Sequence, residues 1–160
     1  MHSAPAVAGF AAVYERHYEV VFRAALRVTG RPADAEDVLQ TVFLRVLSGD
    51  EDEAAKRPAA YFRRAAVNAA VDILRRRAVH AETTFDDGAP QVLVEQPMLL
   101  KVQLRRAIAT LDKDDATLFL LRHVEGLSIE ELAGIFQIER NNVTVRLHRI
   151  RLRLRTELER

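Results

Sequence analysis

The chain has 160 residues, of which 49% are hydrophobic, and a formal net charge of +1, so it can bury one medium core or two small ones. It contains no cysteine, which excludes disulfides and cysteine-ligated zinc and is compatible with a reducing cytoplasm. No signal peptide or membrane span is apparent, because the Ala-rich start has no Lys or Arg before its apolar run and arginines recur soon afterwards. These features predict a soluble, cytoplasmic protein without membrane insertion.

Helical periodicity runs through the first half of the chain, where three helices are predicted. The first covers residues 10–28 and is ended by Gly30. The second covers residues 32–47 and starts with a proline, which suits the first turn of a helix. The third follows Pro58 and ends near residue 77. No convincing strand or repeat appears anywhere in the sequence, so we predict an all-α fold.

The second predicted helix carries an apolar residue on its outer face. Its expected core stripe consists of Ala35, Val38, Leu39, Val42, Phe43 and Val46. Leu44 points the opposite way, within a polar rim formed by Asp37, Gln40 and Thr41. A single exposed leucine is common and usually has no function, so this pattern alone does not identify a binding site.

The third predicted helix also has two faces. Its buried side is expected to consist of Phe62, Ala66, Ala69 and Ile73, and its other face of Tyr61, Arg64, Asn68, Asp72 and Arg75. An aromatic ring among basic and amide groups suits single-stranded nucleic acid, because bases stack on rings and phosphates pair with guanidinium groups. An ordinary surface ion pair of Asp72 with Arg75 or Arg76, beside a half-buried Tyr61, explains the same residues.

Residues 80–97 are predicted to be an acidic interdomain linker. Between residues 78 and 100 there is no Lys or Arg, whereas acidic residues recur and Gly88, Pro90 and Pro97 interrupt any helical period. We therefore expect two small helical domains, residues 1–79 and 98–160, whose relative orientation varies unless they dock. An apolar run at residues 92–94 is the part of the linker able to pack on a helix.

Beyond the linker, helices are predicted at residues 99–110, 114–124, 128–135 and 140–158. Ser128 and Glu131 form an S-x-x-E capping box at the start of the short third one. A short helix, a turn and a longer helix with exposed polar residues at its N-terminus match the outline of a helix-turn-helix. The C-terminal domain is therefore a candidate for binding duplex DNA.

The last predicted helix combines an apolar seam with a polar row. The seam consists of Val143, Leu147, Ile150, Leu154 and Leu158. The candidates for reading bases are the first polar residues, Arg140, Asn141, Asn142 and Arg146, and the candidates for holding phosphates are Arg149 and Arg153. The alternative is a solvated arginine face on a helix whose seam closes the domain core.

Together these segments resemble the extracytoplasmic-function (ECF) sigma factors of bacterial RNA polymerase. The resemblance rests on "YERHYEVVFRAALRVTGRPADAEDVLQTVFLRVL", on "RPAAYFRRAAVNAAVDILRRR" and on "LRRAIATLDKDDATLFLLRHVEGLSIEELAGIFQIERNNVTVRLHRIRLRLR", in that order. It implies a non-enzymatic initiation factor without a cofactor or metal, whose partners are core RNA polymerase, promoter DNA and an anti-sigma factor. The first domain would bind polymerase and the melted minus-ten element, and the second the minus-thirty-five duplex.

The resemblance also assigns residues to these roles. Polymerase binding falls to Asp37, Gln40, Thr41 and Leu44, melted DNA to Tyr61, Arg64, Asn68, Arg75 and Arg76, and duplex DNA to Arg140, Asn141, Asn142, Arg146, Arg149 and Arg153. The chain departs from the family pattern in several places. Thr41 replaces a usual Glu, Leu47 and Tyr61 stand where Trp is frequent, Gln137 replaces the turn Gly, Glu139 replaces the capping Ser, and Thr144 and Val145 replace Lys and Ser.

Two other functions fit parts of the sequence. A helix-turn-helix regulator acting without polymerase would not need the face formed by Asp37, Gln40 and Leu44. A sigma-like adaptor that binds only an anti-sigma protein is favoured by the departures at Gln137, Glu139 and Thr144.

Overall fold

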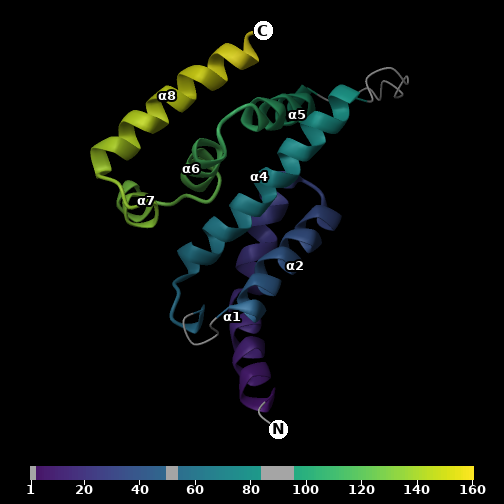
Figure 1. Ribbon diagram of the computed structural model, residues 1–160. Coiled ribbons are helices and arrows are strands. Elements are labelled where there is room, and N and C mark those ends of the chain that lie inside the picture. The colour runs from purple at the N-terminus through teal and green to yellow at the C-terminus, as the bar shows by residue number, and fades with distance from the viewer. Residues whose placement is uncertain (1–2, 50–53, 84–95) are drawn as a thin grey trace.

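The computed structural model describes residues 3–49, 54–83 and 96–160, and in these ranges the regular structure is entirely helical (Figure 1). The helices are α1 (Ser3–Thr29), α2 (Pro32–Ser48), α4 (Ala59–Thr83), α5 (Gln96–Ala109), α6 (Lys113–His123), α7 (Ile129–Phe136) and α8 (Arg140–Leu158). The predicted all-α class is confirmed. None of the described helices is long and apolar enough to cross a membrane.

Two helices differ from their predicted bounds next to the proposed linker. Helix α4 continues to Thr83 instead of ending near residue 77, because no Gly or Pro occurs in its last two turns. Helix α5 begins at Gln96, with Pro97 in its first turn, where a missing N–H costs no hydrogen bond. The central part of the predicted linker, including the apolar run at residues 92–94, lies outside the described residues.

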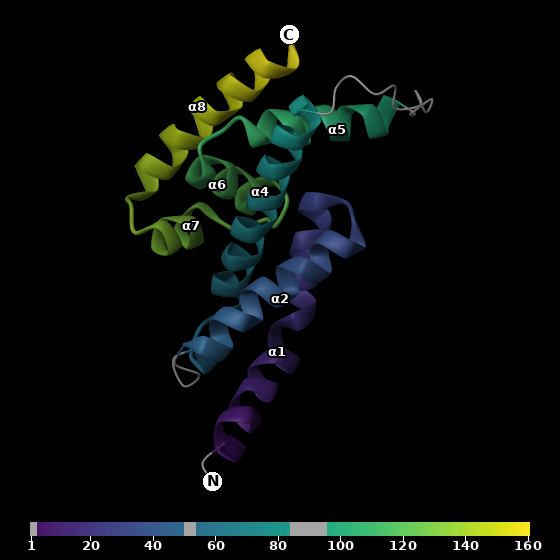
Figure 2. The same cartoon turned by 45° about the vertical axis from the view of Figure 1, so that its right-hand side comes forward.

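Helices α1, α2 and α4 form the N-terminal domain, and α5, α6, α7 and α8 form the C-terminal domain. Helix α1 packs against both α2 and α4, whereas α8 packs against α5, α6 and α7. In both views α8 lies on the outer side of the molecule, away from α1 and α2 (Figures 1 and 2). The buried residues of the two domains nevertheless belong to one hydrophobic cluster.

The two domains are docked on each other through α4, which packs against α5, α6 and α7 (Figure 2). The predicted inner side of α4, Phe62, Ala66, Ala69 and Ile73, is buried. So are Val67, Ala70, Val71 and Leu74, which the sequence analysis did not assign to the core. Helix α4 is thus buried on more than one side, which a single amphipathic stripe does not predict.

Polar contacts join the domains around this apolar seam. The guanidinium of Arg27 on α1 makes a two-point contact with Glu125, with Nε to Oε2 at 2.8 Å and Nη2 to Oε1 at 2.9 Å. This hydrogen bonding raises the pKa of Arg27. On α4, Asp72 accepts a hydrogen bond from Nζ of Lys113 at 2.9 Å. The Glu125 side chain is only 1% exposed, so its charge depends on Arg27 for compensation.

Candidate protein and nucleic-acid interfaces

The outer side of α2 presents the apolar residue that the sequence predicted. Leu44 is 62% exposed, and Asp37, Gln40 and Thr41 around it are exposed as well. These four residues are called the α2 face below. The opposite side of the helix buries Ala35, Val38, Val42, Phe43 and Val46, with Leu39 half-buried. The structure therefore leaves the α2 face without a partner among the described residues, as expected of a docking surface.

The α2 face continues into an open groove of about 610 Å³ between α1 and α2. Tyr14 forms one wall of this groove, with its ring stacked on Tyr18 at 5.4 Å and edge-on to Phe43 at 4.9 Å. Leu47 on α2, which is 50% exposed, lines it next to Leu44. Tyr14 was not connected with Leu44 from the sequence. The four-residue spacing of Tyr14 and Tyr18 was the available signal.

The predicted melted-DNA residues on α4, called the α4 face below, have two different environments. Tyr61 is 41% exposed with the Arg57 guanidinium 4.8 Å from its ring centre, and Arg75 and Arg76 are also exposed. Arg64 and Asn68 are only partly exposed, because the C-terminal domain packs over them. The α4 face is therefore accessible at its two ends and covered in its middle.

The contacts of these two covered residues are specific. Asn68 accepts a hydrogen bond through Oδ1 from the hydroxyl of Thr117 at 2.7 Å, and Thr117 is fully buried. Arg64 donates through Nη1 to the backbone oxygen of Ile135 at 2.8 Å and lies 4.5 Å from the centre of the Phe136 ring. In this conformation Asn68 Oδ1 and Arg64 Nη1 are hydrogen-bonded to the C-terminal domain, so binding of these two atoms to a nucleic acid would have to break those bonds.

Helices α7 and α8 form the predicted helix-turn-helix. The capping box is complete, since the Ser128 hydroxyl accepts from Glu131 N–H and the Glu131 carboxylate accepts from Ser128 N–H, both at 3.1 Å. These hydrogen bonds to its charged form lower the pKa of Glu131. Leu127 and Leu132, which flank this box as the two members of a hydrophobic staple, are both buried. The start of α7 is therefore fixed by the residues that the sequence analysis identified.

The turn between these helices shows the consequence of two departures from the family pattern. Gln137 has φ 55° and ψ 45°, and it is the non-glycine residue with positive φ among those described. Glu139 occupies the N-cap of α8 without a side-chain hydrogen bond to the helix. A side chain is disfavoured at positive φ and Glu caps poorly, so this turn is less favourable than a Gly and Ser version would be.

Helix α8 presents most of the predicted duplex-binding residues to solvent. The seam Val143, Leu147, Ile150 and Leu154 is buried, but Leu158 is 39% exposed, because it lies in the last turn beyond the packed part of the helix. Arg140, Asn141, Asn142, Arg149 and Arg153 are exposed, and Arg146 is half-buried. These six residues are called the α8 row below.

Some members of the α8 row also hold the domain together. Arg146 pairs with Asp115 of α6 at 2.7 Å, so it ties α8 to α6. Arg153 donates to the backbone oxygen of Thr110 at 3.3 Å, and Arg140 lies 3.2 Å from the carboxylate of Glu130. Outside residues 1–2, 50–53 and 84–95, no cluster of His, Cys, Asp or Glu could hold a metal ion.

Comparison with known proteins divides the chain at the same place. Residues 13–79 match the family model of sigma-70 region 2, and residues 101–154 match that of sigma-70, region 4. The RNA polymerase sigma-E factor of Streptomyces avermitilis is 30% identical, over 88% of this chain and 80% of that protein. The ECF RNA polymerase sigma factor SigE of Mycolicibacterium smegmatis is 28% identical, over 89% of this chain but 59% of the longer relative.

A solved structure has the same overall fold. It is the sigma factor RpoE of Bartonella quintana in complex with the anti-sigma factor NepR, with a TM-score of 0.54 and 16% identity. The match covers 94% of this chain and 96% of that chain. The likeness therefore extends over both helical domains.

Proposed function

The chain belongs to the ECF sigma factors of bacterial RNA polymerase, and on this basis we propose that it binds core RNA polymerase and directs transcription initiation at specific promoters. The observation that carries the proposal is the presence of region 2 and region 4, in that order, in one chain. As a sigma factor the protein is an initiation factor and not an enzyme, and it acts in the cytoplasm, where the polymerase is.

The α2 face is proposed to bind core polymerase. Leu44 supplies an exposed apolar centre, and Asp37 and Gln40 supply polar groups at its rim, which is the usual composition of a protein interface. The adjoining groove with Tyr14 and Leu47 enlarges the apolar surface on one side. Thr41 is uncharged, so Asp37 supplies the carboxylate of the α2 face.

The α4 face is proposed to bind the melted strand of the minus-ten element. Tyr61 offers a ring on which a base can stack, and Arg75 and Arg76 offer charge to phosphates. Arg64 and Asn68 complete this face only after their contacts with Ile135 and Thr117 are broken. Promoter melting is therefore proposed to require separation of the docked domains.

The α8 row is proposed to read the minus-thirty-five element as duplex. A helix lying in the major groove contacts bases mainly through its first turns, where Asn141 and Asn142 are exposed. Arg149 lies further along α8, makes no hydrogen bond or ion pair with any described residue, and suits a phosphate. Arg146 is proposed to contribute to DNA binding while it also ties α8 to α6 through Asp115.

An anti-sigma factor is proposed as a further partner. The B. quintana sigma factor of similar fold was solved with its anti-sigma factor bound. In this chain the α2 face is the exposed apolar surface that polymerase would need, so a protein that covers Leu44 would keep the chain inactive.

Run-off transcription with purified core polymerase and genomic promoter fragments tests the function directly. The chain should support transcripts from a subset of fragments, and Leu44→Ala combined with Asp37→Ala should abolish them and weaken capture of core polymerase. Both residues are exposed, so helicity and melting temperature should change little. Leu100→Ala combined with Glu19→Ala is the matched control, since Leu100 is 56% exposed and Glu19 is exposed. A folded Leu44 and Asp37 variant that still captures polymerase would contradict the assignment of this face.

A further inference from the structure

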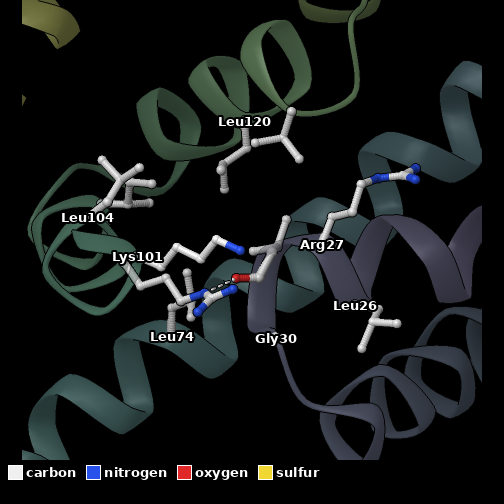
Figure 3. A pocket seen from close by; sticks show the side chains of 11 residues that line it. Leu26, Arg27, Gly30, Leu74, Lys101, Leu104 and Leu120 are labelled. Atoms are coloured by element: carbon white, nitrogen blue, oxygen red, sulfur yellow. Dashed lines mark hydrogen bonds between the residues drawn. The ribbon is translucent and has the colours of Figure 1, made fainter. Parts of the chain in front are cut away.

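A pocket at the seam between the domains gathers positive charge. It has a volume of about 410 Å³ and lies where the end of α1 meets α4 and α5. Arg31 and Arg77 reach it from the N-terminal domain, and Arg105 and Arg106 from the C-terminal domain. An apolar pocket, drawn in Figure 3, adjoins it, because Gly30, Leu74 and Arg105 line both pockets.

Part of this cluster has a structural role at the end of α1. Arg105 donates through Nε to the backbone oxygen of Val28 at 2.8 Å, the hydrogen bond drawn in Figure 3. Arg77 donates through Nη1 to the oxygen of Thr29 at 3.0 Å. These carbonyls are in the last turn of the helix, where cations are favourable. A Cβ on residue 30 would lie 2.7 Å from Arg105 Nη2, so only Gly30, at φ +73°, admits the guanidinium so closely.

The positive charge exceeds what this role requires. Asp34, in contact with Arg77, is the carboxylate paired with the cluster among the described residues. The side chains of Arg31 and Arg106 make no hydrogen bond or ion pair with any described residue. Burial lowers the pKa of Arg77 and of Arg105, and Arg31 lowers both further by repulsion. The pocket therefore holds several guanidinium groups that repel one another.

We propose that this pocket binds a small phosphate-bearing anion, held between guanidinium groups of both domains. Guanidinium groups match phosphate in geometry as well as charge, because each presents parallel N–H donors to two oxygens. The volume is that of a small-molecule site, since such sites measure roughly 300–1,000 Å³. Leu74 and Val102 line the same pocket and can pack against an organic group that carries the phosphate.

The position of the pocket couples the anion to domain docking. Two of its arginines belong to each domain, so all four surround the anion only while the domains are docked. A ligand that binds one conformation better shifts the equilibrium towards that conformation. The effect on transcription rests on the proposed function. In that function the bound anion favours the docked form, opposes exposure of Arg64 and Asn68, and so opposes promoter melting.

Titration of the full chain with inorganic tripolyphosphate tests the site. Calorimetry should show one tight site, and the anion should raise the melting temperature. Arg31→Gln and Arg106→Gln should each bind the anion about tenfold more weakly, the loss expected for one charge-assisted hydrogen bond. Arg23→Gln, which removes an exposed charge of α1 that does not line the pocket, should bind like the parent. Without anion, Arg31→Gln should melt at a higher temperature than the parent, because it relieves repulsion with Arg77 and Arg105.

Three results would overturn the site. The first is equal binding of tripolyphosphate by the parent and all three variants, and the second is no binding at all. The third is that the parent binds a duplex of unrelated sequence but not tripolyphosphate, and that Arg31→Gln loses this duplex binding, which would assign these arginines to the DNA backbone. None of these titrations uses polymerase or a promoter, so failure here is distinguishable from failure of the transcription assay.

Discussion

Helix α8 and the middle of α4 carry similar side chains, arginine and asparagine, in opposite surroundings. Asn142 and Arg149 on α8 are exposed, and both views place that helix on the outer side of the molecule (Figures 1 and 2). Asn68 and Arg64 on α4 bind Thr117 and Ile135 of the other domain. Residue type alone therefore does not decide whether a candidate nucleic-acid face is available.

Because one face is exposed and the other is covered, the two proposed steps of promoter recognition differ in their free-energy cost. The proposed duplex binding by the α8 row needs no change in domain arrangement, whereas the proposed binding of a melted strand by the α4 face must also overcome the docking free energy. The apparent affinity for single-stranded DNA equals the affinity of the open form multiplied by the fraction of molecules that are open. A duplex contact made first can thus hold the chain on the promoter before the domains separate.

The largest expected effect comes from breaking the docking contact at Glu125. Arg27→Glu removes the two-point hydrogen bond and places a like charge beside a carboxylate whose side chain is 1% exposed. Docking should weaken by about 3 kcal/mol, which raises affinity for a single-stranded minus-ten oligonucleotide by up to about a hundredfold. Fluorescence anisotropy measures the affinity, and small-angle scattering should show a larger radius of gyration.

Arg23→Glu makes the same charge change at an exposed position of α1 and is the control for this experiment. It should leave both the scattering profile and the affinity for single strands close to those of the parent. An Arg27→Glu chain that is expanded in solution but binds single strands no better would show that docking does not limit the α4 face.

The α8 row should respond differently, because it is already exposed. Asn142→Ala should cost about 1–3 kcal/mol on the preferred promoter duplex and little on a scrambled one. Arg149→Ala should weaken binding to both duplexes alike and lower the slope of log affinity against log salt by about one. Salt-dependent titrations of the full chain measure both effects. Equal affinity of the parent for both duplexes would remove sequence reading from α8.

The smallest expected effect is on the free energy of unfolding and arises within the C-terminal domain. Gln137→Gly should raise the free energy of unfolding by about 1 kcal/mol, because Gly adopts the positive φ of this turn without steric cost. Urea denaturation followed by circular dichroism measures the change. Single-strand affinity should stay as it is, since the Gln137 side chain makes no hydrogen bond with any described residue of α4. A loss of stability in Gln137→Gly would mean that the side chain makes contacts that outweigh the backbone strain.

The sequence predicted α8 and the α2 face well because both depend on local patterns. Leu44 lies outside the stripe of its own helix, and the seam from Val143 to Leu154 follows the helical period. The covering of Asn68 was not predictable in this way, since its partner Thr117 lies on another helix far along the chain. Periodicity reports which side of a helix is polar, not which distant polar group meets it.

The same limit explains why the contacts of two arginines within the chain were not predicted. Arg64 and Arg146 were both interpreted as nucleic-acid contacts, and each also binds a group that no spacing rule indicates, the oxygen of Ile135 and the carboxylate of Asp115. Gln137 illustrates the opposite case. Its position in a helix-turn-helix made a positive φ foreseeable, and the structure gives it 55°.

A reversible link across the docked seam tests most directly whether the domains must separate for promoter melting. The chain has no cysteine, so Asp72→Cys and Lys113→Cys, which replace an ion pair between α4 and α6, can be joined by a short, reductant-cleavable bismaleimide. Permanganate reactivity of promoter thymines with core polymerase then reports melting. We predict that the linked chain still binds the minus-thirty-five duplex but gives no reactive thymines, and that cleavage of the linker restores them. Full melting by the linked chain would contradict the account.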